Sequence, residues 1–258
     1  MRIDELHANR QAQNRQTLRD LSKYAHTLEF ARKMEEAQRV LYQFLERCHT
    51  PVVSCGGGKD GTAVLLLATN MDPDIRVVCA NPPNPLPDRE DHLHNLKHFV
   101  RCTWDDVPYP WDVDAVLDGK KPYPNKLKMR RLSQWAEENG VDGVIFGLRN
   151  AESKARALNF AKNGHIYTTR AGLRCQPLAR WTWRDVICLS LLWDAPINPV
   201  YTKMDGISNL DHLHDGTWWP HGTQDRAAWM RRYYPDFYPL YLAAQKVEGQ
   251  KEYIPCTY

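Results

Sequence analysis

The apolar positions of the chain predict alternating helices and strands. From Leu28 to about Cys48, apolar side chains recur at three- and four-residue steps, which is typical of an amphipathic helix that ends before Pro51. Two short apolar runs, Val52-Val53 and residues 75–80, predict buried strands, and the apolar run at 63–68 between them has helical character. A strand, a helix and a second strand in this order predict a right-handed βαβ unit and hence a parallel sheet.

The same pattern predicts further elements downstream. We expect helices at residues 89–100 and 128–139 and a strand at residues 143–146. Residues 103–126 are rich in Trp, Pro, Asp and Lys, and we expect them to form a long loop over the sheet edge. Residues 1–20 are polar and predict an arm or a solvated helix. The expected fold class is therefore α/β, with a doubly wound parallel sheet.

A glycine-rich stretch joins the first strand to its helix. Residues 54–62 read Ser-Cys-Gly-Gly-Gly-Lys-Asp-Gly-Thr. Glycines let the main chain approach a phosphate group closely, the first N–H groups of the following helix are unpaired, and Lys59 adds a positive charge. The stretch therefore predicts a phosphate loop, with a tight connection that binds no ligand as the alternative. It is not a P-loop, because Lys59 is followed by Asp60 and not by Ser or Thr.

Two other stretches lie at the same predicted sheet edge. Residues 81–88 are too rich in proline for a helix and are well placed to wall an adenosine pocket. Gly147 follows the strand at 143–146, Arg149 then stands at the sheet edge, and Arg156 follows two helical turns later. Two guanidinium groups suit a pyrophosphate or another anion, because each can bind oxygens in a bidentate manner. The alternative is that Glu152, Lys154 and Arg156 form a solvated helix face with a local salt bridge.

Net charge, cysteine count and the length of apolar runs argue against several classes of protein. The net charge of +3 is too small to argue for nucleic acid, and seven cysteines without a CxxC pair argue against a disulfide framework or a four-cysteine metal site. No run of 18 apolar residues occurs. We expect a cytoplasmic protein that neither is secreted nor spans a membrane.

Histidines offer a metal site as a weaker alternative. His94 and His98 are spaced i, i+4 on a predicted helix, which could bring two imidazoles onto one face. The C-terminal stretch holds His212, His214 and His221 among many aromatic residues. We favour an aromatic cap that packs on the main domain, although its Arg-Arg-Tyr-Tyr cluster at 231–234 could contact a nucleic acid or a nucleotide acceptor.

The motifs together resemble the phosphoadenylyl-sulfate reductase branch of the PP-loop ATP pyrophosphatase superfamily. The SGGKDS loop of that superfamily aligns on Gly57-Gly58-Lys59-Asp60, and its two serines fall on Gly56 and Gly61. The other motifs of the branch match Gly147, Arg149, Glu152, Ser153 and Arg156, then Pro177, Trp181, Thr182, Asp185 and Val186, and then Pro196, Asn198, Pro199 and Tyr201.

The resemblance implies a Rossmann-like adenine nucleotide α-hydrolase fold. Residues 1–48 would form the N-terminal arm and helix, residues 49–203 the nucleotide-binding domain, and residues 204–258 an aromatic-rich cap. Most members of the superfamily bind ATP with Mg²⁺, cleave it between the α and β phosphates and transfer AMP to an acceptor. Here the acceptor would be a small molecule or a nucleic acid, and a second copy of the chain or a partner subunit is possible.

The resemblance also implies roles for individual residues. Lys59, Asp60, Arg149 and Arg156 would be catalytic, Asp60 would also bind the metal ion, and the two arginines would neutralise charge in the transition state. The residues expected to contact the nucleotide are Ser54, Gly56, Gly57, Gly58, Lys59, Asp60, Gly61, Thr62, Ala80, Asn81 and Gly147.

Two alternatives stay open. A sulfonucleotide reductase would use Cys256 as its nucleophile and a thiol donor such as thioredoxin, but Cys256 has neither Glu before it nor Gly after it. Reductases also generally lack the Gly-Gly-Lys-Asp loop, which this chain keeps. The second alternative is a catalytically silent nucleotide-binding regulatory protein, which would be consistent with the loss of both loop serines.

Overall fold

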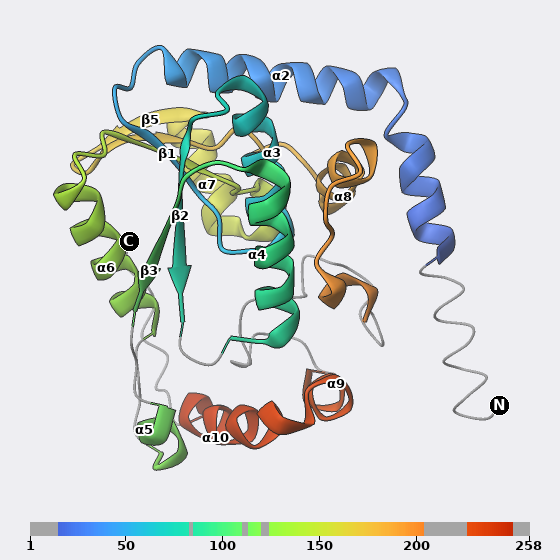
Figure 1. Ribbon diagram of the computed structural model, residues 1–258, viewed down its shortest axis with the longest axis vertical. Coiled ribbons are helices and arrows are strands. Elements are labelled where there is room, and N and C mark those ends of the chain that lie inside the picture. Colours follow the sequence, from blue (N-terminus) through green and yellow to red (C-terminus); the bar gives the residue numbers. More distant parts are fainter. Residues whose placement is uncertain (1–14, 83–84, 110–112, 120–123, 204–225, 250–258) are drawn as a thin grey trace.

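The protein folds around one six-stranded sheet (Figure 1). The computed structural model describes residues 15–82, 85–109, 113–119, 124–203 and 226–249. The strands, in their order across the sheet, are β3 (Trp104–Pro108), β2 (Arg76–Asn81), β1 (Pro51–Ser54), β4 (Gly143–Phe146), β6 (Gly172–Cys175) and β5 (Ile166–Thr169). All neighbours pair in parallel except β5, which pairs antiparallel with β6. The predicted α/β class and parallel sheet are confirmed.

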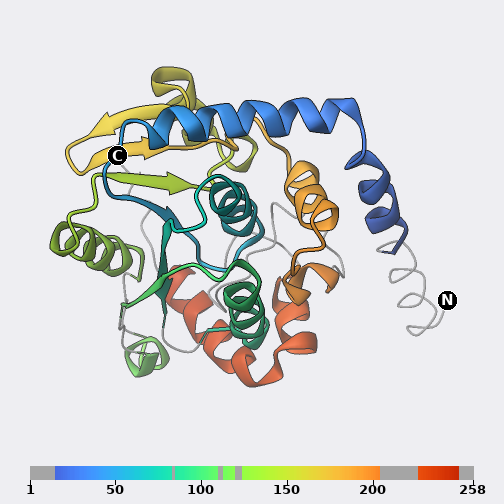
Figure 2. The same ribbon diagram turned by 45° about the horizontal axis from the view of Figure 1, so that its top comes forward.

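Helices cover both faces of the sheet (Figures 1 and 2). After a helical segment at residues 15–24, the described α-helices are α2 (Leu28–Leu45), α3 (Lys59–Met71), α4 (Pro87–Val100), α5 (Val113–Leu117), α6 (Pro124–Glu138), α7 (Lys154–Asn163), α8 (Trp183–Leu192), α9 (Arg226–Tyr233) and α10 (Tyr238–Gly249). The part of the chain that the structure describes also contains the short 3₁₀ helices η1 (Asn150–Glu152), η2 (Pro199–Thr202) and η4 (Pro235–Phe237). The prediction of a doubly wound sheet therefore holds.

Successive residues of the central strands contribute to two different apolar clusters, one on each face of the sheet. Val53 and Ile145 belong to the large apolar cluster that α2, α3 and α8 cover, whereas Val52 and Val144 belong to a small cluster with Trp135 of α6. Successive strand residues point to opposite faces, so both faces of the central strands need apolar side chains. Helix α3 is buried along residues 62–68, which explains why that stretch is apolar without interruption.

One prediction was wrong in part. The expected loop at 103–126 contains the edge strand β3, the short helix α5 and the start of α6. The pattern hid β3 because Val107 is its one buried residue. Within the predicted polar arm, the described residues 15–20 are helical and are exposed or partly buried, as a solvated helix requires. The helix continues beyond the arm to residue 24, and there Leu21 is buried. None of the helices within the described ranges is long and apolar enough to cross a bilayer.

The strand order reverses direction between β1 and β4. The chain moves outward from β1 through β2 to β3 and then returns to the other side of β1 with β4. At such a switch point the loops that follow the two strands diverge and leave a crevice beyond the carboxyl ends of the strands. The glycine-rich loop after β1 and the Gly147–Arg149 turn after β4 both lie at this point.

Candidate functional site

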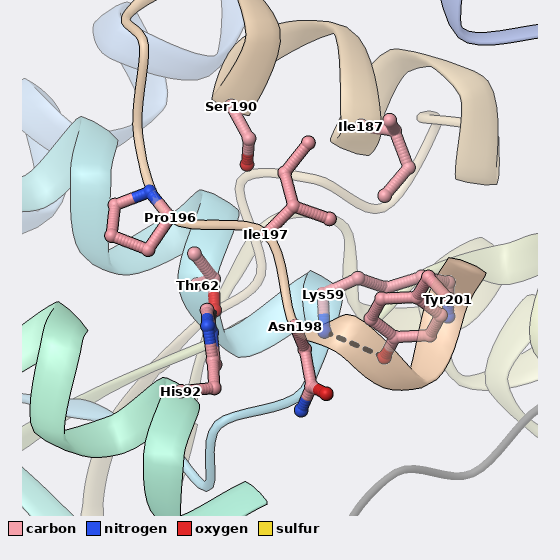
Figure 3. A pocket seen from close by; sticks show the side chains of 9 residues that line it. All are labelled: Lys59, Thr62, His92, Ile187, Ser190, Pro196, Ile197, Asn198 and Tyr201. Atoms are coloured by element: carbon pink, nitrogen blue, oxygen red, sulfur yellow. Dashed lines mark hydrogen bonds between the residues drawn. The ribbon is translucent and has the colours of Figure 1, made fainter. Parts of the chain in front are cut away.

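The glycine-rich loop passes directly into the first turn of α3. Gly58 is the N-cap of α3 and provides no side-chain cap. Gly57 has φ +89°, in the left-handed region, and a Cβ there would lie 3.1 Å from the Leu93 side chain. The N–H of Lys59 donates to the hydroxyl of Tyr201 at 2.9 Å (Figure 3). Gly57 thus permits the left-handed turn of the loop, and the Tyr201 hydroxyl holds the first N–H of α3.

Three charged side chains meet at the switch point. Lys59 Nζ lies 2.8 Å from Asp60 Oδ2, and Arg149 Nε donates to the other carboxylate oxygen, Oδ1. The Arg149 side chain is fully buried. Burial alone would raise the pKa of Asp60, but the charges of Lys59 and Arg149 outweigh it and hold the pKa below its ordinary value. Asp60 is therefore ionised, and the cluster carries one net positive charge.

Gly147 lies against the backbone that carries Asp60. A Cβ at Gly147 would lie 2.2 Å from the Asp60 carbonyl oxygen and 2.9 Å from the Gly61 nitrogen. The end of β4 thus touches the first turn of α3 at a point where a side chain has no room. This contact brings Arg149, two residues later, to Asp60.

Arg156 is brought to Glu152. Its guanidinium pairs with Glu152 Oε2, and the same oxygen accepts the N–H of Arg149 at 2.9 Å. The Arg156 side chain is 39% exposed. The local salt bridge considered as an alternative is thus present. Its acidic partner, Glu152, also contacts the backbone of the buried Arg149.

The remaining loop residues differ in their surroundings. Gly56 is exposed, and a Cβ there would meet nothing within 4 Å, whereas a Cβ at Gly61 would meet Cys55 Cα at 3.4 Å. There is therefore room for a side chain at both positions where the superfamily motif has serine. Ser54, the last residue of β1, is partly buried.

Thr62 points into a small pocket behind the loop (Figure 3). Its hydroxyl lies 3.0 Å from Nε2 of His92, which is almost fully buried. The pocket is lined by Lys59, Thr62, His92, Ile187, Ser190, Pro196, Ile197, Asn198 and Tyr201. The hydroxyl of Thr62 is thus engaged inside the protein.

The burial of His92 should make the free energy of unfolding depend on pH. Desolvation lowers the pKa of His92 from 6.5 to about 4. Between these values the unfolded chain binds a proton that the folded chain does not, so this group lowers the free energy of unfolding as pH falls, by up to about 3 kcal/mol. Urea unfolding from pH 7 to 4 should show a shallower pH dependence for His92→Gln than for the wild type. His94→Gln, at an exposed position of the same helix, should keep the wild-type dependence, and an equal slope in all three proteins would contradict the prediction.

Arg89 supports the loop and was missed by the sequence analysis. The side chain is buried, and its Nε donates to the Gly56 carbonyl at 2.9 Å. Its Nη2 donates to the Ala80 carbonyl at 3.0 Å and to Asn81 Oδ1 at 3.1 Å. Ala80 and Asn81 are thus joined to the glycine-rich loop through one arginine. An isolated arginine in the first turn of a helix gives no sequence signal for such a role.

Asn198 and Tyr201 form a second support. Asn198 Nδ2 donates to the Gly57 carbonyl at 3.3 Å, and Tyr201 accepts the N–H of Lys59. Both side chains are buried. The sequence analysis matched these residues to a family motif without predicting a contact with the loop.

The described residues offer one carboxylate for a metal ion at the loop. No group of three or more His, Cys, Asp or Glu side chains within the described ranges could hold a metal ion. Magnesium is commonly bound by one or two carboxylates together with substrate phosphates, and Asp60 fits that arrangement. The His94 and His98 rings lie 4.4 Å apart, and His98 Nδ1 bonds the His94 carbonyl. His212, His214, His221 and Cys256 lie outside the described residues.

Known proteins give an independent comparison. The family model of the phosphoadenosine phosphosulfate reductase domain matches residues 50–210. A phosphoadenylyl-sulfate reductase from Candida auris, solved as a phosphate complex, is similar with a TM-score of 0.55 and 15% identity, over 78% of this chain and 94% of that chain. Candida glabrata FMN adenylyltransferase with FMN and an ATP analogue is similar with a TM-score of 0.54 and 14% identity, over 83% of this chain and 78% of that chain. At these identities the likeness concerns the fold. A search of curated protein sequences gives no match.

Proposed function

Because the chain belongs to the phosphoadenosine phosphosulfate reductase family, we propose that it binds an adenine nucleotide at the switch point between β1 and β4. We further propose that the nucleotide is ATP, which the protein cleaves between the α and β phosphates. The observation that carries this proposal is the Lys59–Asp60–Arg149 cluster at the start of α3. A glycine-rich loop, a helix N-terminus and two cations at one point suit a polyphosphate.

The cluster suggests how the site would respond to an anion. Lys59 has a flexible stem and would exchange Asp60 for a phosphate oxygen, whereas the buried Arg149 would stay in place. Asp60 would hold a magnesium ion that arrives with the phosphates, and that ion would neutralise phosphate charge. Arg149 would stabilise the charge that develops on the departing pyrophosphate, and Arg156 would join it after release from Glu152. FMN adenylyltransferase of the same fold has been solved with ATP, which supports this choice of nucleotide.

The chemical step would be the transfer of AMP. An acceptor oxygen would attack the α phosphorus, and the bond from this phosphorus to the α,β-bridging oxygen would break. The bonding electrons would leave with pyrophosphate, and the acceptor would lose its proton to solvent or to a base. The acceptor would be a small molecule or a nucleic acid.

Reduction of an adenylyl sulfate is the second candidate. The family model itself describes a reductase domain, and the Candida auris neighbour is such a reductase. In this case the Cys256 thiolate would attack the sulfate sulfur, the bond from that sulfur to the bridging oxygen would break, and the adenosine phosphate would leave with that oxygen. A dithiol donor such as thioredoxin would then displace sulfite from Cys256, regenerate the thiol and become oxidised to a disulfide.

Isothermal titration separates the two candidates. We would titrate the purified full chain, in the presence of Mg²⁺, with ATP and with phosphoadenosine phosphosulfate, and then assay pyrophosphate release. ATP binding with pyrophosphate release, unchanged in Cys256→Ser, is the expected result. Preference for the sulfonucleotide, together with loss of activity in Cys256→Ser, would overturn it. Nucleotide binding without any turnover would favour a regulatory protein.

A further inference from the structure

The glycine-rich loop depends on contacts from outside its own sequence. Three consecutive glycines have few intrinsic restraints, so their order must come from neighbouring groups. Three such contacts are present: Arg89 to the Gly56 carbonyl, Asn198 to the Gly57 carbonyl and Tyr201 to the N–H of Lys59. They come from two segments, the start of α4 and the segment 198–203 that contains η2 (Figure 3).

The end of the 198–203 segment is held by α9. Trp229 Nε1 donates to the Lys203 carbonyl at 2.6 Å. Lys203 Nζ donates to the Tyr234 hydroxyl at 3.3 Å and lies 4.6 Å from the centroid of the Tyr234 ring. Trp229 and Tyr234 are almost fully buried. Lys203, two residues after Tyr201, is therefore fixed by the C-terminal helices.

The start of α4 is held at the same point. Asp88 Oδ2 accepts Lys203 Nζ at 2.5 Å and also accepts the Tyr234 hydroxyl. Asp88 directly precedes Arg89 in the first turn of α4. One cluster, Asp88–Lys203–Tyr234, thus joins both loop supports to the C-terminal helices, which lie far from α2 in both views (Figures 1 and 2).

We propose that Asp88, Lys203 and Tyr234 are positioning residues, through which the docking of α9 holds the glycine-rich loop in its nucleotide-binding conformation. This proposal rests on the proposed function and extends it to residues that do not touch the loop. The Lys203–Asp88 ion pair is partly buried, and such a pair adds little net stability compared with apolar packing, so stability alone does not account for the cluster. The cluster instead fixes the register between three segments that are distant in sequence.

The first test needs no nucleotide. Tyr234→Phe removes the hydroxyl that bonds Asp88 and Lys203 but keeps the ring. Tyr238→Phe is the matched control, because Tyr238 is partly buried in α10 and its ring stacks on Tyr241. Hydrogen exchange of amides 56–62 in the ligand-free full chain should be about threefold or more faster in Tyr234→Phe, and unchanged in Tyr238→Phe.

The second test is affinity. For ATP with Mg²⁺, measured well below the melting temperature, Kd should rise roughly five- to tenfold in Tyr234→Phe and stay unchanged in Tyr238→Phe. Asp88→Asn should reproduce both effects if Tyr234→Phe fails to fold. A lower melting temperature with wild-type loop exchange and affinity would show a merely structural cluster and overturn the proposal. If the wild type binds no nucleotide, the proposed function fails, while the exchange measurements still decide whether α9 positions the loop.

Discussion

Gly147→Ala is expected to abolish nucleotide binding and to lower the free energy of unfolding by about 3 kcal/mol. The added methyl group would lie 2.2 Å from the Asp60 carbonyl oxygen and 2.4 Å from its carbonyl carbon. These are backbone atoms in the first turn of α3, so relief requires movement of the helix or of β4. Either movement separates Arg149 from Asp60. Urea unfolding and titration with ATP and Mg²⁺ would measure the two effects.

Gly56→Ala is the control for the stability effect. It makes the same chemical change in the neighbouring loop, at a position where a Cβ meets nothing within 4 Å. Its free energy of unfolding should therefore stay within about 0.5 kcal/mol of the wild type. If Gly147→Ala is equally harmless, the close contact between β4 and α3 does not fix the site.

Arg149→Met is expected to destabilise the fold by about 3 to 5 kcal/mol and to remove ATP cleavage. Arg149 is fully buried, and its loss leaves the Asp60 carboxylate with Lys59 and without its second cation. Methionine fills part of the volume without hydrogen-bond donors. Denaturant unfolding measures the stability, and single-turnover pyrophosphate release measures the chemistry.

Arg156→Met separates this effect from a general loss of charge. Arg156 is 39% exposed and forms an i, i+4 pair with Glu152, an arrangement worth about 0.3 to 0.5 kcal/mol. Equal losses of unfolding free energy in Arg149→Met and Arg156→Met would contradict the role of the buried cluster.

A double variant tests the contact between Asp60 and Arg149 directly. Asp60→Asn combined with Arg149→Met should lower the free energy of unfolding by less than the sum of the two single variants, because the two side chains interact.

The sequence predicted the centre of the fold better than its edges. The central strands β1, β2 and β4 are apolar on both faces, so their runs were recognisable, and the glycines marked the turn into α3. The edge strand β3 has polar residues whose partners belong to other elements: Asp105 pairs with Arg76 of β2, and Asp106 with Lys97 of α4. The β5–β6 hairpin also escaped prediction, since its strands are only four residues long and β5 has no buried residue.

In the candidate site, the charged motif residues could be predicted from the sequence, but the residues that support the loop could not. Lys59, Asp60 and Arg149 stand in motifs at the ends of neighbouring strands, so their meeting could be expected from the topology alone. Arg89 and Tyr201 hold the loop through its backbone carbonyl and N–H groups. Such contacts depend on how α4 and η2 pack in three dimensions, and no local pattern of residue types reports them.

The residues of β3 affect whether two copies of this chain can associate through the edge of the sheet. An edge strand exposes unpaired backbone groups that can recruit a strand from another molecule. Here Asp105, Asp106 and the terminal Pro108 belong to that border strand, where charged side chains would lose water on pairing with another strand and proline offers no N–H. The sheet is therefore poorly suited to grow sideways into a second copy through β3, and this border protects the protein against edge-to-edge aggregation.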